Sequence, residues 1–430
     1  MVIAAGLMFS PDTLVLFGNG VGALGALLLV VLPLAILVHL GTVSSLGELH
    51  ATPDGFVGGL RTAIGNRTAS ILLICGKLPF AICASAGLVV TAGFVFNEVF
   101  VYWFPNFTFA YLLLILVLVL NIFSPNTALR AQAVAIAGAG TGLLVLACFG
   151  ILGAAETEAA AAGSGGFDIR YLSAAVIVLV GYDMGLTAGW QSRLKSSPSI
   201  RVLVIALLIG GVLLALWGLA AMILVPAAKL ESSTIPHMIV ARKALGQPGR
   251  IIMGLVAIFG VFAAVNAMLH SISMTTKSLA SAMGDADMAM SPARIRVITL
   301  LFTAIASATL MFLGFAGEPI LESWIRGGMV LWLIYYASLN VAAIRRGSSG
   351  VEGRGKGGGA NTATLLRSLA IIGTALTIVG LVLLEPALTD MLVFLVAVTA
   401  AIIALVIGAG FYTNRGAHKI SEDHSGSVHP

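Results

Sequence analysis

Apolar runs of about 20 residues recur along almost the whole chain, and each is long enough to cross a bilayer as a helix. This feature restricts the fold more than any other. Of the 430 residues, 59% are hydrophobic and 10% are charged, whereas a soluble domain carries about 25% charged residues. Alternating strands of about ten residues do not occur, which argues against a membrane barrel. The sequence therefore predicts an all-α polytopic membrane protein.

Eleven long apolar helices are expected, and a short apolar segment, "MVIAAGLMFSP", precedes them. We interpret this segment as the second half of a first helix whose first half is missing. Most of the 23 lysines and arginines fall in alternate loops, which predicts a cell-membrane protein with a cytoplasmic C-terminus. The expected domains are a transmembrane domain over 1–412 and a polar cytoplasmic tail over 413–430. The expected helices lie at about 18–48, 69–97, 108–124, 131–154, 171–192, 200–226, 250–284, 295–316, 322–344, 365–384 and 388–412.

The stretch "LVGYDMGLTAGW" places Asp183 between Gly181 and Gly185 inside an apolar run. A carboxylate within a span is costly and faces a cavity or a partner. The glycines predict that the helix breaks there, and free backbone groups at membrane depth are tolerated only where protein or a wet cavity surrounds them. Two five-helix repeats, over about 1–154 and 171–344, would each begin with an interrupted helix, as in inverted-repeat transporters. Two extra helices would follow over about 365–412.

Enzymatic and nucleic-acid functions find no support in the sequence. The three cysteines all lie in apolar runs, and no Cys or His spacing typical of a metal site occurs. Motifs of hydrolases, zinc proteases and nucleotide-binding loops are absent. The net charge of +5 reflects topology signals rather than a nucleic-acid partner. We expect no enzyme, no cofactor and no metal site.

Four segments resemble the amino acid–polyamine–organocation permease superfamily in the expected order. "GLMFSP" resembles the broken first helix of that family, and "GYDMGLTAGWQSRLKSSPSIRVLVIALLI" resembles its sixth helix and exit. "SSLGELHATPDGFVGGLRTAIG" resembles the end of the second helix and the loop after it. "MTTKSLASAMGDADM" resembles the end of the eighth helix.

The resemblance implies two five-helix inverted repeats plus two C-terminal helices. It also implies secondary active transport of an amino acid or a related small amine by alternating access, coupled to protons or working by exchange, with sodium coupling as a less favoured option. The partners would be a small-molecule substrate and membrane lipid. The alternative function is a non-transporting membrane sensor or assembly subunit that keeps the permease fold.

In that family, backbone groups of the two broken helices hold the substrate. By position, this implies substrate binding at Ala5, Gly6, Phe9, Gly181 and Tyr182. Close helix packing is the alternative role for the glycines, and Tyr182 could be a gate or core filling. Side-chain lining is expected from Ser85 and Val178, and its small, apolar character favours small neutral substrates.

Five residues are candidates for coupling. Asp183 could carry a proton or stabilise the break, and Lys77 could face it from the third helix or extend to the cytoplasmic rim. His270, on a polar stripe of the eighth helix, is a candidate proton carrier or a satisfied core histidine. The neighbouring hydroxyls of Ser271 and Ser273 are the nearest candidates for an ion site.

Overall fold

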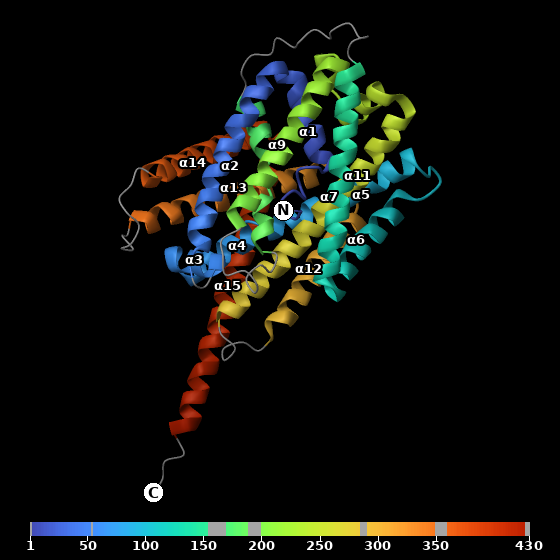
Figure 1. Ribbon diagram of the computed structural model, residues 1–430. Helices are drawn as coiled ribbons and strands as arrows, with labels where there is room; N and C mark the ends of the chain where they lie inside the picture. Colours follow the sequence, from blue (N-terminus) through green and yellow to red (C-terminus); the bar gives the residue numbers. More distant parts are fainter. Residues whose placement is uncertain are drawn as a thin grey trace.

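The computed structural model describes residues 2–52, 55–153, 169–187, 199–283, 290–348 and 359–425. Every regular element in these ranges is a helix, and ten helices are long and apolar enough to cross a membrane. The predicted fold class, an all-α polytopic membrane protein, is confirmed (Figure 1). The long elements are α1 (Pro11–Leu24), α2 (Leu28–His50), α3 (Gly55–Ile64), α4 (Asn66–Cys75), α5 (Leu78–Val99), α6 (Asn106–Phe123), α7 (Pro125–Leu152), α8 (Ile169–Ile177), α9 (Ser199–Leu224), α11 (Pro236–Met283), α12 (Pro292–Phe312), α13 (Pro319–Ser348), α14 (Gly359–Leu384) and α15 (Leu388–Ser425).

The single helix predicted over 18–48 is wrong, because the chain turns sharply in its middle. Helix α1 ends at Leu24, the short η1 (Gly25–Leu27) forms the turn, and α2 runs back from Leu28. Gly25 takes a φ of 53°, which a residue with a side chain rarely adopts. Hydropathy stays high through the turn, so the apolar pattern alone gave no boundary. Residues 18–24 therefore belong to the first helix.

Two other predicted boundaries differ from the structure. Element α11 has a non-helical backbone at Gly246, so a helical segment from Pro236 that was not predicted precedes the helix predicted from about residue 250. Helix α15 continues to Ser425, so most of the predicted polar tail is helical, and Figure 1 shows this end projecting away from the bundle. The division into repeats at 1–154 and 171–344 stays a prediction.

Three helices begin with the same local signal, a serine followed by proline. Ser10, Ser124 and Ser291 cap α1, α7 and α12, and each hydroxyl accepts a hydrogen bond from the backbone N–H three residues later. Proline suits the first helical position because its missing N–H would have no partner there.

Helix α11 lies at the centre of one half of the bundle and packs against α5, α7 and α12. Helix α14 packs against α2 and α13 on the other side. Most of α11 is buried, whereas α15 is mostly exposed within its span. The bundle thus surrounds α11 with protein and leaves its outer helices for lipid.

Candidate functional site

The first interruption precedes α1. Residues 2–9 form successive turns, with backbone hydrogen bonds from Gly6 to Ile3 and from Ser10 to Leu7, before Ser10 caps the helix. These residues are almost all buried. The turns agree with the predicted non-helical segment before α1, and its role as the break of a longer helix stays a prediction.

The second interruption follows α8. This helix ends at Ile177, residues 178–181 form turns, and the 3₁₀ helix η3 (Tyr182–Thr187) follows. Gly181 has a φ of 105°, a conformation that favours glycine. The predicted break at the "GYD" stretch is therefore confirmed.

The two interruptions touch each other. A Cβ added at Gly181 would come within 2.7 Å of the Cδ1 atom of Leu7, and one added at Gly185 would come within 3.2 Å of the Cβ atom of Ala4. Both breaks therefore pack directly against each other inside the bundle. There is little room at this contact for a side chain in place of either glycine.

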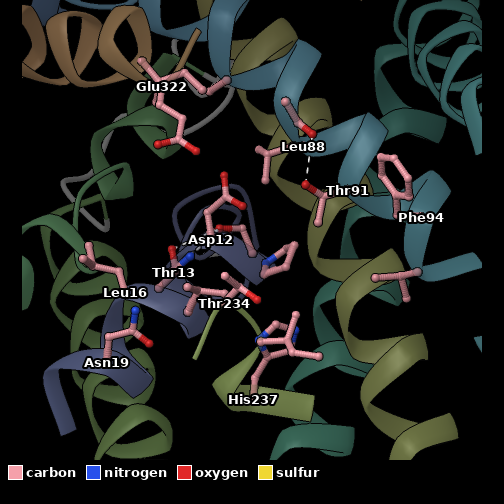
Figure 2. Close-up of a pocket in the computed structure, with 18 of the residues that line it drawn as sticks. Asp12, Thr13, Leu16, Asn19, Leu88, Thr91, Phe94, Thr234, His237 and Glu322 are labelled. Carbon is pink, nitrogen blue, oxygen red and sulfur yellow. Dashed lines mark hydrogen bonds between the residues drawn. The ribbon is translucent and has the colours of Figure 1, made fainter. Parts of the chain in front are cut away.

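A cavity of about 1180 Å³ includes Leu7 of this contact in its lining, and Figure 2 draws part of that lining. Leu7 and Val180 line the cavity, and so do Glu98, Glu231 and Glu318, which lie at or next to helix ends. The charge distribution in the loops predicts that the face with these helix ends is external. Helices α1, α5, α8, α11 and α13 all contribute to the walls. A solute entering from that face would therefore reach both broken segments.

An ion pair lies beside the second break. The ammonium of Lys77 is 2.8 Å from the Oδ2 atom of Asp183, and the two side chains are 3% and 0% exposed. Tyr336 on α13 donates a hydrogen bond of 2.7 Å to the other carboxylate oxygen, and the N–H of Gly181 donates to the Tyr336 hydroxyl at 3.2 Å. Lys77 also donates to the hydroxyl of Ser271 at 3.3 Å.

This arrangement joins four helical elements around one charge pair. Lys77 lies at the kink between α4 and α5, Asp183 on η3, Ser271 on α11 and Tyr336 on α13. Because a buried charge is costly without a partner, the pair and its hydrogen bonds hold these elements together in the present conformation. Of the two alternatives left open for Lys77, the structure shows the one in which it faces Asp183.

Aromatic rings enclose the pair. The ring of Tyr335 lies under the Lys77 ammonium at 5.5 Å, a cation–π geometry. Tyr182 and Tyr336 have ring centroids 5.5 Å apart, and His39 contacts both rings. The Nε2–H of His39 donates to the carbonyl of Val176 at 2.8 Å, so its Nδ1 accepts from the Tyr182 hydroxyl at 3.3 Å. Tyr182 is therefore part of a buried seal.

A second polar network lies along α11. The amide of Asn266 donates to the Oε1 atom of Gln132 at 2.7 Å, and Asn121 donates to Asn266 at 2.7 Å. His270 contacts Asn121 through Nδ1 at 3.2 Å, and its buried Nε2 has no hydrogen-bond partner among the described residues. Gln132 also donates to the carbonyls of Val2 and Ala263, at 3.3 and 3.0 Å. The network thus connects the first break to α7 and α11.

Helices α2 and α13 are also joined by hydrogen bonds, which lie beyond His39 and Tyr336 along the two helices. The hydroxyl of Ser45 donates to the Oδ1 atom of Asn340 at 2.7 Å, and the Asn340 amide donates to the Thr42 hydroxyl at 3.0 Å. Both helices are thereby fixed relative to each other.

The remaining predicted site residues are dispersed. Ala5 and Phe9 border a separate apolar hollow of about 520 Å³ between α7 and α9. Gly6 packs against α11, where an added Cβ would come within 2.7 Å of Ala267. Val178 is buried and does not line the large cavity. Gly6 therefore matches the close-packing alternative given for the glycines.

Two predicted hydroxyls also differ in their surroundings. The hydroxyl of Ser273 donates to the carbonyl of His270 on its own helix, at 2.9 Å. Ser85 is fully buried, and its hydroxyl has no hydrogen-bond partner in the described part of the chain. Only Ser271 of the predicted hydroxyls contacts the ion pair.

Several cavity and network residues were missed by sequence reasoning. Asp12 follows the Ser-Pro start of α1 and lines the cavity, and Tyr336 and His39 hold the groups around Asp183. Asp12 had a sequence signal, since it lies immediately after the predicted break. Tyr336 had none, because it lies 153 residues from the carboxylate that it contacts.

Glu385 lies between α14 and α15 and forms a charge cluster with Arg326, which lines the cavity. Glu385 accepts hydrogen bonds from Ser323 at 2.8 Å and from the N–H of Ala387 at 3.0 Å, and it pairs with Arg326 at 3.0 Å. Burial is the largest single effect and raises the pKa of Glu385. The hydrogen bonds and the Arg326 charge together outweigh it and lower this pKa below its ordinary value.

Among the described residues, no three His, Cys, Asp or Glu side chains lie close enough together to hold a metal ion. The chemistry available at the breaks is hydrogen bonding from backbone groups and the buried ion pair.

No family model matches the chain, and no curated protein sequence matches it. Solved structures of a manganese transporter from Eremococcus coleocola are similar in fold. For one mutant the TM-score is 0.57 at 13% identity, covering 97% of this chain and 94% of the other. For its complex with an aromatic bis-isothiourea substituted compound the TM-score is 0.53 at 12% identity, with the same coverage. The likeness spans nearly both full lengths and shows that this chain shares the fold of that multi-pass membrane transporter.

Proposed function

We propose that this protein is a secondary active transporter of an amino acid or a related small amine, working by alternating access. The observation that carries the proposal is the cavity of about 1180 Å³ that ends at two touching helix breaks. Broken helices tolerate free backbone groups at membrane depth only beside protein or water, and such groups bind solutes in transporters. The likeness to a transporter fold supports the same conclusion. The sequence resemblance to the amino acid–polyamine–organocation superfamily supports the choice of substrate.

Alternating access requires that one side close while the other opens. The cavity is open toward Glu98 and Glu318, and beyond the breaks the Lys77–Asp183 pair lies buried among tyrosines. Opening the opposite side would require α5, η3, α11 and α13 to separate around this pair. We therefore propose that Lys77 and Asp183 form the closed gate and couple its opening to a proton.

A proton is preferred to sodium because the position beside Ser271 is filled by the Lys77 ammonium. The Lys77 ammonium would thus take the place of a sodium ion bound from solution. A proton bound by Asp183 from one side of the membrane would remove the negative charge that pairs with Lys77, and its release on the other side would restore the pair. Without that charge the gate would be held less strongly.

An amine is favoured over manganese, the ion that the structural neighbours transport. The described ranges contain no group of three His, Cys, Asp or Glu side chains that could hold the ion.

The test is uptake into liposomes reconstituted with the purified protein. Radiolabelled amino acids and small amines are offered with a pH gradient, with a sodium gradient and with neither. We expect saturable uptake that the pH gradient accelerates and the sodium gradient leaves unchanged. The Lys77→Met variant should lose the acceleration by the pH gradient, while Lys243→Met, at an exposed position, should keep it.

The absence of saturable uptake and of exchange for every solute would overturn the proposal. Specific binding without any transport would instead favour the alternative of a sensor or assembly subunit.

A further inference from the structure

An unpaired carboxylate lies in the cavity. Asp12, in the first turn of α1, is exposed and lines the cavity. Among the described residues, no hydrogen bond or ion pair reaches its carboxylate. Figure 2 shows the carboxylates of Asp12 and Glu322 extending toward each other across the cavity. Two carboxylates thus face each other in this part of the cavity, and no cation among the described residues pairs with Asp12.

The neighbouring arginine does not remove this imbalance. Arg326 is 3.4 Å from Glu322 and 3.0 Å from Glu385, so one guanidinium is shared between two acids. Arg250, at the cavity mouth, donates to the backbone carbonyl of Glu98 at 2.8 Å. Asp12 is left as a carboxylate without a matching cation.

A second polar group along the same cavity also lacks a partner. His237, at the start of α11, is 3% exposed, and its Nδ1 atom has no hydrogen-bond partner in the described ranges. Figure 2 places His237 and Thr234 beside the same hollow as Asp12. A buried nitrogen without a partner is costly, and a neutral imidazole can accept a hydrogen bond from a ligand.

The start of α1 is unsuited to a ligand carboxylate. The positive end of a helix attracts anions, and here Asp12 already occupies the first turn. The hydroxyl of Ser10 also accepts from the N–H of Thr13 at 3.3 Å. A carboxylate brought to this end would meet the charge of Asp12.

The other walls of the cavity are apolar. Phe80, Leu88 and Phe94 come from α5, with Leu16 from α1 and Ile325 from α13. Such walls fit a hydrocarbon body attached to the charged group and give no ligands to a bare metal ion.

We propose that the cavity binds an organic cation, an amine on an apolar body with no carboxylate beside it, and that Asp12 and Glu322 hold its ammonium group. The proposal deepens the proposed function and rests on it for transport. Binding itself can be measured without transport. It also departs from the neutral substrates that the lining of small residues predicted from sequence.

The experiment compares two ligands that differ only in the carboxylate. Leucine and 3-methylbutylamine are titrated against the full-length protein in detergent, and the thermal unfolding midpoint is measured, since a ligand of the folded state raises it. MnCl₂ and the uncharged 3-methylbutan-1-ol are titrated in parallel. We expect a saturable rise with the amine alone.

Asp12→Asn should weaken binding of the amine by about 10- to 100-fold, the range for a hydrogen bond to a charged group. Asp390→Asn is the matched control, since Asp390 is exposed and lies outside the cavity lining. It should bind the amine like the unmodified protein. Should Asp12→Asn not fold, Glu322→Gln at an exposed position supplies the same test with a smaller loss.

Stronger stabilisation by leucine than by the amine would overturn the proposal. So would stabilisation by MnCl₂ or the alcohol alone, or amine binding that both variants leave unchanged. Amine binding without uptake would overturn the transport function and leave this site standing. Uptake of leucine unaffected by Asp12→Asn would do the reverse.

Discussion

Removing one member of the Lys77–Asp183 pair should destabilise the protein strongly. In Lys77→Met, the carboxylate of Asp183 keeps its hydrogen bond from Tyr336 but loses the ammonium that lies 2.8 Å away. The carboxylate is fully buried, so no water replaces the lost partner. Breaking a buried pair from one side costs roughly 3–5 kcal/mol, and we expect a loss of this size in the free energy of unfolding.

The double variant Lys77→Met/Asp183→Asn separates the charge effect from packing. With both charges gone, the asparagine oxygen can still accept from Tyr336, and no unpaired charge remains. Replacing a buried pair by neutral groups is often nearly neutral, so the double variant should be more stable than Lys77→Met alone. The coupling energy between the two sites should exceed about 1 kcal/mol.

The assay is unfolding by SDS in mixed micelles, followed by far-UV circular dichroism. Lys243→Met serves as the control and should change the free energy of unfolding by less than about 0.5 kcal/mol, because that position is exposed. Additive losses in the double variant, or a loss below about 1 kcal/mol in Lys77→Met, would show that the pair does not stabilise this conformation.

Three further predictions concern the break, the network and the outer charge cluster. Gly181→Ala should lower both the unfolding midpoint and uptake, because the added Cβ would come within 2.7 Å of Leu7 and the backbone there has a φ of 105°. Gly153→Ala, with open space around it, should change neither. Equal unfolding midpoints for the two variants would refute this prediction. Asn266→Leu should cost roughly 2–5 kcal/mol in SDS unfolding, because Gln132 and Asn121 lose buried partners, and a neutral result would show that the network relaxes. Glu385→Gln should destabilise at neutral pH. Because the pKa of Glu385 is lowered on folding, its stabilisation is present above the ordinary glutamate pKa and is lost as pH falls through the lowered value, so the two proteins should converge in acid; a pH-independent difference would contradict it.

The local features of the fold were predictable from sequence. Apolar runs of about 20 residues give the membrane helices, because length and hydropathy alone decide whether a segment spans. The break at Gly181 followed from a carboxylate and two glycines within such a run. The turn at Gly25 was missed, since hydropathy does not change where the chain merely reverses within apolar surroundings.

The site was only partly predictable, for the same reason. Asp183 needed a partner because a charge at membrane depth is costly. Lys77 was a candidate because it is a lysine inside a predicted span. Ala5, Phe9 and Val178 were assigned by position in a motif, and the structure places them away from the large cavity. Their contacts depend on how the broken segments rotate, which a motif does not encode.

The sequence by itself thus determined that this chain crosses the membrane repeatedly and that its helix breaks at Asp183, because the cost of desolvating a charge is a property of the residue and its neighbours. The tertiary structure alone decided which groups meet that charge. Tyr336 reaches Asp183 and Ser271 reaches its partner Lys77, both from distant helices, and Asp12 faces Glu322 across a cavity. Such partners are set by long-range packing, in which residues hundreds of positions apart become neighbours, and no local pattern records that choice.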